Sequence, residues 1–174
     1  MEGETIVTIV AIFLAAILIG IFPLMSIADR NDDIAQLSVQ TDIAEFVDTV
    51  RKTGKITQDE YNALVTKLYA TGNTYNVDME VQVLDENPSK KTTQQTDTKI
   101  GENIYYSVYT TQIENVLKEN GKYPLKEGDK IIVSASNTNT TIAQMLKNFF
   151  YSLSGNNTYS IVASQSGVVA VTGE

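Results

Sequence analysis

The chain contains no cysteine, no histidine and no tryptophan among its 174 residues. Without cysteine it forms no disulfides, thiolate nucleophiles or thiolate metal sites. Without histidine it lacks the commonest general base near neutral pH and the commonest metal ligand, which excludes Ser-His-Asp, Cys-His and histidine–zinc chemistry. Serines are plentiful, but none has the Ser-x-x-Lys spacing of a lysine-activated nucleophile. We therefore predict a protein that is not an enzyme, with no catalytic, metal-binding or cofactor-binding residues and no cofactor.

Positive charge is also scarce, because 13 basic residues stand against 21 acidic ones and give a net charge of -8. Such a surface repels a phosphate backbone, and it would release no counterions on binding one. Nucleic acid is therefore excluded as a partner.

Charge of either sign is missing from one long segment near the N-terminus, Thr5 to Ala28, which consists mainly of isoleucine, valine, leucine and phenylalanine. About 20 apolar residues, at a rise of 1.5 Å each, match a hydrocarbon core of about 30 Å, and only an internally hydrogen-bonded helix is stable there. We predict a single-pass membrane helix over residues 1–30, in contact with lipid, and an extracytoplasmic domain over residues 31–174.

A cleaved signal peptide is the alternative, because Ser26 and Ala28 have the small-residue spacing that signal peptidase recognises. Two features favour an uncleaved anchor. Glu2 and Glu4 precede the apolar run where a signal peptide carries basic residues, and the run exceeds the usual core of about 7–15 residues. The nearby Arg30 alone indicates the opposite topology only weakly.

Helical patterns continue beyond the apolar segment and place residues 31–72 in helices. The first carries an apolar stripe at steps of three and four, Val39, Ile43, Phe46, Val47 and Val50, and no glycine or proline separates Pro23 from Gly54. One long rod, either straight or kinked, is therefore expected to end near Gly54. Asp29, Asp32 and Asp33 lie on this rod, and we interpret them as a solvated patch near the membrane rather than a calcium site.

A second helix is expected after Thr57, which forms a capping box with Glu60, and it should end near Gly72. Residues 73–174 mix strands and helices. Tyr75 to Leu84 alternates as a half-buried strand, with Asp78 and Glu80 pointing outward. Residues 85–102 are too polar to order themselves and are predicted to be an exposed loop.

Apolar character resumes at 104–109 and passes at helical spacing into a helix that ends near Glu119. A strand over 130–135 precedes a helix from about Asn139 to Leu153, which we expect to be the main helix on the sheet. The tail, 159–171, resembles a hairpin with Gly167 at its turn. Tyr75 and Tyr109 should be core residues, whereas Tyr106 and Tyr123 should be surface residues.

These elements predict an α+β fold, in which a long N-terminal helix, first transmembrane and then amphipathic, is followed by a small antiparallel sheet packed by helices. Two sequences, at Asn139 and Asn156, match the glycosylation acceptor pattern, but we expect them to serve in caps or turns.

The plan of an apolar helix with Glu4 near its head and Pro23 near its far end, continued into a small α+β head, resembles type IV pilins and pseudopilins. The segments 22–33, 54–57 and 69–75 are similar to small proteins found beside Tad-type pilus machinery in low-GC Gram-positive bacteria. The resemblance implies that Glu4 or Glu2 neutralises the terminal amine of a neighbouring subunit. It also implies an N-terminus in the cytoplasm, a head outside and self-association, or association with envelope subunits, through the helix.

The chain departs from the pilin pattern in two respects. No basic leader precedes a Gly-Phe junction, and the interval from Glu4 to Pro23 exceeds the usual one, so prepilin peptidase processing at Gly3 is not expected. Three functions follow as hypotheses, and the weakest is a membrane-bound enzyme that uses carboxylates such as Glu80 or Asp78, because solvent exposure already explains their outward position. The first is a pilin-like structural subunit, or membrane-anchored component, of a Tad or type IV filament-like envelope machine at the cell surface. The second is a secreted or surface-anchored binding module whose signal peptide is cleaved after Ala28.

Overall fold

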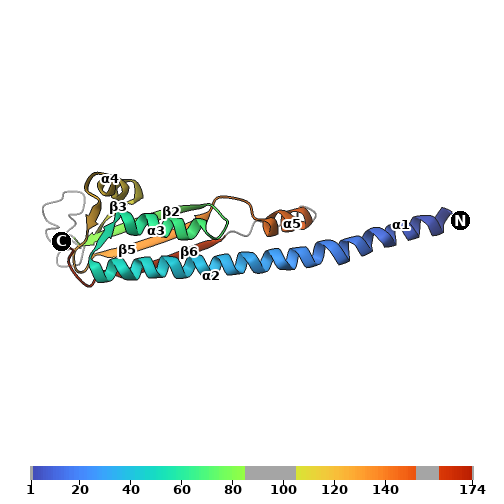
Figure 1. The fold of residues 1–174 in the computed structure, drawn as a ribbon, viewed down its shortest axis with the longest axis horizontal. Coiled ribbons are helices and arrows are strands. Elements are labelled where there is room, and N and C mark those ends of the chain that lie inside the picture. Colours follow the sequence, from blue (N-terminus) through green and yellow to red (C-terminus); the bar gives the residue numbers. More distant parts are fainter. Residues whose placement is uncertain (1, 85–104, 152–160, 174) are drawn as a thin grey trace, which may run out of the picture.

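The computed structural model describes residues 2–84, 105–151 and 161–173, and consists of a rod joined to a head (Figure 1). The rod projects from the head along the long axis, so that the two termini lie at opposite ends of the molecule (Figure 1). The head combines antiparallel sheets with helices, which confirms the predicted α+β class. The predicted exposed loop over 85–102 lies outside the described residues.

The rod is one uninterrupted helix, and its span from Gly3 to Thr53 is 51 residues long. It comprises α1 (Glu2–Ala16), the π-helical turn η1 (Ile17–Ile21) and α2 (Phe22–Thr53). In η1 the amide of Phe22 donates to the carbonyl of Ile17, five residues earlier, immediately before Pro23. Because proline lacks an amide hydrogen and crowds the preceding turn, a widened turn is a common way for a helix to accommodate it.

The end of the rod is fixed by local chemistry. Gly54 follows α2 in the left-handed conformation, with φ of 68°, and its amide donates to the carbonyl of Val50. Arg51 and Lys52 lie in the last turn, where positive charge interacts favourably with the helix dipole. The predicted C-terminus of the long helix is therefore confirmed.

The main sheet has four antiparallel strands in the order β3-β2-β5-β6. The strands are β3 (Tyr105–Tyr109), β2 (Tyr75–Leu84), β5 (Lys130–Asn137) and β6 (Val162–Val168). A second, two-stranded sheet pairs β1 (Lys55–Thr57) with β4 (Lys122–Pro124). The alternation predicted for 75–84 is confirmed, because Met79 and Val81 are buried while Asp78 is exposed.

The core lies between the sheet and the helix α2, whose predicted stripe is buried in full: Val39, Ile43, Phe46, Val47 and Val50. The helix α3 (Gln58–Tyr69) packs beside α2 and adds Leu64 and Leu68. It begins with the predicted capping box, in which the amide of Glu60 donates to Thr57 Oγ1 at 3.2 Å and the amide of Thr57 donates to Glu60 Oε2 at 3.1 Å. A further helix, α4 (Thr110–Asn120), follows β3 directly.

Three sequence predictions about the second half were wrong. Residues 162–168 form one strand, not part of a hairpin, and Gly167 has no positive φ because it lies inside β6 against the side chain of Arg51. The main helix on the sheet is α2, whereas α5 (Ile142–Tyr151) packs on α2 itself. Tyr109 is exposed, because its pairing with Glu80 places it on the outer face, whereas Tyr75 is buried as predicted.

Candidate functional site

The projecting half of the rod has almost no contact with the rest of the protein. None of the residues from Gly3 to Ala16 is buried, and Glu4 and Pro23 are exposed too. The side chain of Glu2 lies outside the described residues. The large exposed apolar side chains of the segment are Ile6, Val7, Ile9, Val10, Ile12, Phe13, Leu14, Leu18, Ile19, Phe22, Leu24 and Ile27. Its length and composition are those of a membrane-spanning helix or a signal sequence.

The alternative cleavage site, Ser26 and Ala28, lies within α2, and the helix continues unbroken past it. Ser26 is exposed, whereas Ala28 is 7% exposed. In the part of the chain that the structure describes, Ala28 is the first buried residue from the N-terminus. The junction between the bare part of the rod and the packed part therefore falls at this residue.

The junction is held by α5, which docks on α2 through polar contacts that we call the clasp: Asp29 with Lys147, and Asp32 with Thr141. Lys147 Nζ lies 2.6 Å from Asp29 Oδ1. Thr141 Oγ1 donates to Asp32 Oδ2 at 2.6 Å, and Asp32 is 8% exposed. A short distance along the rod, Gln36 donates to the carbonyl of Val162 and accepts from its amide.

The solvated acidic patch predicted from Asp29, Asp32 and Asp33 is therefore wrong for the first two residues, since Asp29 is half-buried in an ion pair and Asp32 is buried. Asp33 is exposed as predicted. The physical reason is that two carboxylates three residues apart share one helix face, which here faces α5. Within the described ranges, no cluster of acidic side chains has the arrangement of a metal site.

Thr141 has two roles in the clasp, because its hydroxyl also caps α5. The amide of Gln144 donates to Thr141 Oγ1 at 3.2 Å, and the amide of Thr141 donates to Gln144 Oε1 at 3.1 Å. Nearby, Asn139 Oδ1 accepts from the amide of Thr74 at 2.9 Å. These contacts agree with the cap and turn roles predicted for the segment that begins at Asn139.

The substitution Thr141→Val is expected to undock α5 while the sheet stays folded. It removes a cap contributing about 1 kcal/mol and leaves the buried carboxylate of Asp32 without its donor, at a further cost of about 1–3 kcal/mol. Amide hydrogen exchange should speed up in α5 and stay unchanged in β2 and β5. The exposed neighbour gives a matched control, since Thr140→Val should leave every rate as in the wild type. Unchanged protection of α5 in Thr141→Val would show that the clasp contributes nothing.

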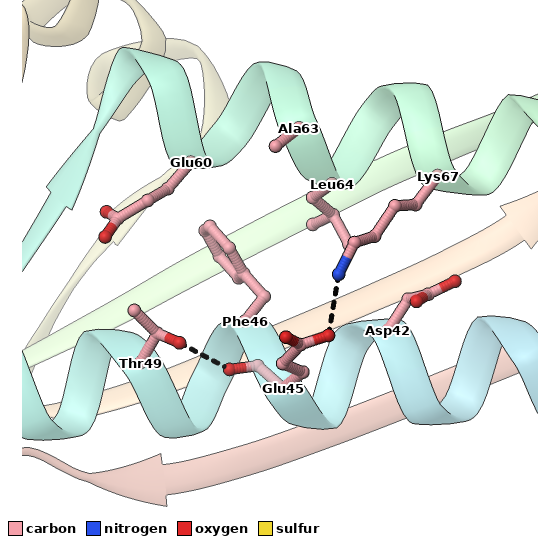
Figure 2. Close-up of a pocket in the computed structure, with 8 residues that line it drawn as sticks. All are labelled: Asp42, Glu45, Phe46, Thr49, Glu60, Ala63, Leu64 and Lys67. Atoms are coloured by element: carbon pink, nitrogen blue, oxygen red, sulfur yellow. Dashed lines mark hydrogen bonds and ion pairs between the residues drawn. The ribbon is translucent and has the colours of Figure 1, made fainter.

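A shallow pocket of about 170 Å³ lies between α2 and α3 (Figure 2). Its charged side chains are already engaged, because Lys67 Nζ lies 2.6 Å from Glu45 Oε2 and Glu60 closes the cap of α3. The hydrogen bond to Glu45 raises the pKa of Lys67, so the amine stays protonated at neutral pH and is not available as a base. The pocket, floored by Phe46 and Leu64, is best explained as the seam between two packed helices.

The outward carboxylates of β2 are likewise hydrogen-bonded. Ser107 Oγ donates to Glu80 Oε1 at 2.6 Å and Gln82 Nε2 donates to the same oxygen at 3.1 Å. The bond from Ser107, helped by that from Gln82, lowers the pKa of Glu80, so the carboxylate is ionised at neutral pH. Asp78 accepts from Asn76 Nδ2 at 2.9 Å.

No family model, no curated protein and no solved structure matches this chain. The site is therefore defined by its own geometry, in which an apolar rod emerges from the head at Ala28. Sequence reasoning placed the apolar segment and missed the clasp. The sequence did contain a signal for the clasp, because α5 has a single charged residue, Lys147, and the rod carries two carboxylates on one face.

Proposed function

We propose that the protein is a pilin-like structural subunit, or a membrane-anchored component, of a Tad or type IV filament-like envelope machine, with its head outside the cytoplasm. The observation that carries the proposal is the division of one 51-residue helix into a bare apolar half and a packed amphipathic half. An exposed apolar surface of this size is unstable in water and indicates contact with lipid or with other proteins. The membrane removes this apolar surface from water before assembly, and neighbouring subunits would remove it from water in a filament.

The candidate assembly residues fit this arrangement. Glu4 and Pro23 lie on the bare half of the rod, one near each end of the apolar segment. An unpaired carboxylate within lipid costs several kcal/mol, so Glu4 would gain from pairing with a positive group of a neighbouring copy. Glu2 is the second candidate for the same role.

Disulfide crosslinking in cells tests assembly, and the absence of natural cysteine makes every introduced thiol unique. We expect the double variant Val7→Cys with Ile9→Cys, whose side chains lie on opposite sides of α1, to give a ladder of multimers on oxidation. The matched pair Lys118→Cys with Asn120→Cys, exposed on α4 of the head, should give monomers under the same conditions. A protein that stays monomeric in the α1 variant would contradict the filament subunit.

The carboxylate is tested in the same crosslinking background. Glu4→Gln is expected to shorten the ladder, because the neutral amide cannot form an ion pair with a neighbouring amine. Glu2→Gln, two residues away, tells whether the role belongs to one carboxylate or to both. A full ladder in the double Gln variant would exclude any part for these carboxylates while leaving the membrane anchor in place.

The alternative, a secreted or surface-anchored module, is favoured by one observation. Burial in the described chain begins at Ala28, so cleavage after that residue would leave the clasp residues Asp29 and Asp32 with the head. A head released in this way would keep its core intact, because the buried stripe of α2 begins later along the rod.

A further inference from the structure

The helix α5 lies beyond the end of the sheet, alongside the rod and on the side of the projecting apolar segment (Figure 1). The clasp fixes the direction in which it runs. Thr141, just before α5, contacts Asp32, and Lys147, within the helix, contacts Asp29. Advancing along α5 therefore means moving back along the rod, from the head toward the apolar segment.

This direction brings α5 to the boundary of the expected lipid phase. The uncharged segment ends at Ala28, and Lys147 is already level with Asp29, the next residue. Four more helical residues follow Lys147, which at 1.5 Å each extend about 6 Å further toward the apolar segment. If the rod spans the membrane, the last turn of α5 is at the depth of the membrane interface.

The chemistry of α5 suits that depth. Its outer face carries Ile142 and Met145, which are 58% and 54% exposed. Lys147 is the single charged residue among its ten, and it is turned inward onto Asp29, with 22% of its side chain exposed.

The clasp removes the main obstacle to contact with lipid. Charged groups at the edge of the hydrocarbon region are costly unless they are paired. Asp29 is paired with Lys147, and Asp32 accepts from Thr141. The rod and α5 thus pair these polar groups on the faces they share, and the outer face of α5 keeps the exposed Ile142 and Met145.

We propose that α5 is a second, shallow membrane contact, inserted into the leaflet on the side of the head and clasped to the rod that anchors the protein. The inference rests on the proposed membrane anchor but not on filament formation. Two attachments hold the head at a fixed height and rotation above the lipid. With the rod alone, the head would be free to rotate about the helix axis.

Nitroxide labels on single cysteines test this inference in the full-length chain, reconstituted into vesicles of phosphatidylcholine and phosphatidylglycerol. Oxygen concentrates in lipid and a nickel chelate stays in water, so the ratio of the two collision rates reports depth. Met145→Cys is expected to give a higher ratio of oxygen to nickel collisions than the control on α4, and Ile142→Cys should be shallower than Met145→Cys, because it lies about 4.5 Å earlier along α5. Lys118→Cys on α4 is the aqueous control, and Ile12→Cys reports on the anchor itself.

The outcomes distinguish a failure of the membrane anchor from a failure of the α5 contact. If Ile12 is in lipid while Met145 matches Lys118, the anchor stands and the α5 contact is wrong. If Ile12 is itself in water, the proposed anchor is wrong. If Met145 is shielded from both reagents and becomes accessible when labelled protein is diluted with unlabelled protein, α5 contacts a second copy and the lipid contact is overturned.

Discussion

The double variant Leu14→Lys with Leu18→Lys is expected to release the full-length chain from membranes. Both side chains are more than half exposed and lie one helical turn apart near the middle of the apolar segment. A lysine at the centre of a membrane helix costs roughly 2.5–3.5 kcal/mol, so two cost about 5–7 kcal/mol. The protein that remains in the pellet after alkaline extraction of membranes is the measurement, and most of it should move to the supernatant.

The matched control carries two lysines at the same spacing on the head. Asn62→Lys with Thr66→Lys lie one turn apart on the exposed face of α3, and the protein should stay in the pellet. A Leu14→Lys and Leu18→Lys variant that also stays in the pellet would show that the rod is not the membrane attachment. Retention of both variants would point instead to the head.

The largest loss of stability is expected from Gly54→Ala. A Cβ at this position would overlap the carbonyl oxygen of Val171 and the amide of Gly173, both backbone atoms that cannot yield without moving the chain. The positive φ adds roughly 1–2 kcal/mol for a residue with a side chain. We expect a total of about 3 kcal/mol or more, measured as the free energy of unfolding of the head in denaturant, which is a large share of the usual 5–15 kcal/mol.

Gly121→Ala is the matched control, because it isolates the backbone conformation from the crowding. Gly121 caps α4 at φ of 72°, close to the 68° of Gly54, but nothing lies within 4 Å of the Cβ it would gain. Gly121→Ala should lower the free energy of unfolding only by the cost of the positive φ, roughly 1–2 kcal/mol. Equal losses in the two variants would mean that the C-terminal segment does not pack on Gly54 as the structure has it.

The crowding at Gly54 arises because the C-terminal segment is hydrogen-bonded against the end of the rod. The carbonyl of Gly54 accepts from the amide of Leu125 at 2.7 Å, and the carbonyl of Leu125 accepts from the amide of Gly173 at 2.9 Å. The C-terminal segment thereby closes over the end of the rod, where the amide of Ala170 also donates to the carbonyl of Arg51 at 3.0 Å. These hydrogen bonds fix the rod to the head at its far end.

The parts of the fold that sequence reasoning predicted are those set by local periodicity. The rod, its end at Gly54, the Thr57 cap and the strand 75–84 each follow from spacing or from a cap within a few residues. The candidate residues Glu4 and Pro23 were placed on the bare half of the rod for the same reason. Their proposed roles depend on partners and remain predictions.

The parts that were wrong depend on contacts between distant segments. Gly167 suggested a turn, but its lack of a side chain instead makes room for Arg51, which lies more than a hundred positions earlier. The apolar face of α5 suggested packing on the sheet, but it is Asp29 and Asp32 that bind α5 to the rod. Neither the contact of Gly167 with Arg51 nor the docking of α5 on the rod can be read from a local pattern. Segments of similar periodicity can pack in different places, and contacts between distant segments determine which place each one takes.

The mass of the protein purified from its native cells tests the central claim most directly, because it tells whether residues 5–28 remain attached to the head. We predict a mature chain that retains them and is recovered from the membrane or from sheared surface filaments. A mature N-terminus at Asp29 would contradict the account, because cleavage after Ala28 removes the only part of the described chain that is long and apolar enough to cross a membrane.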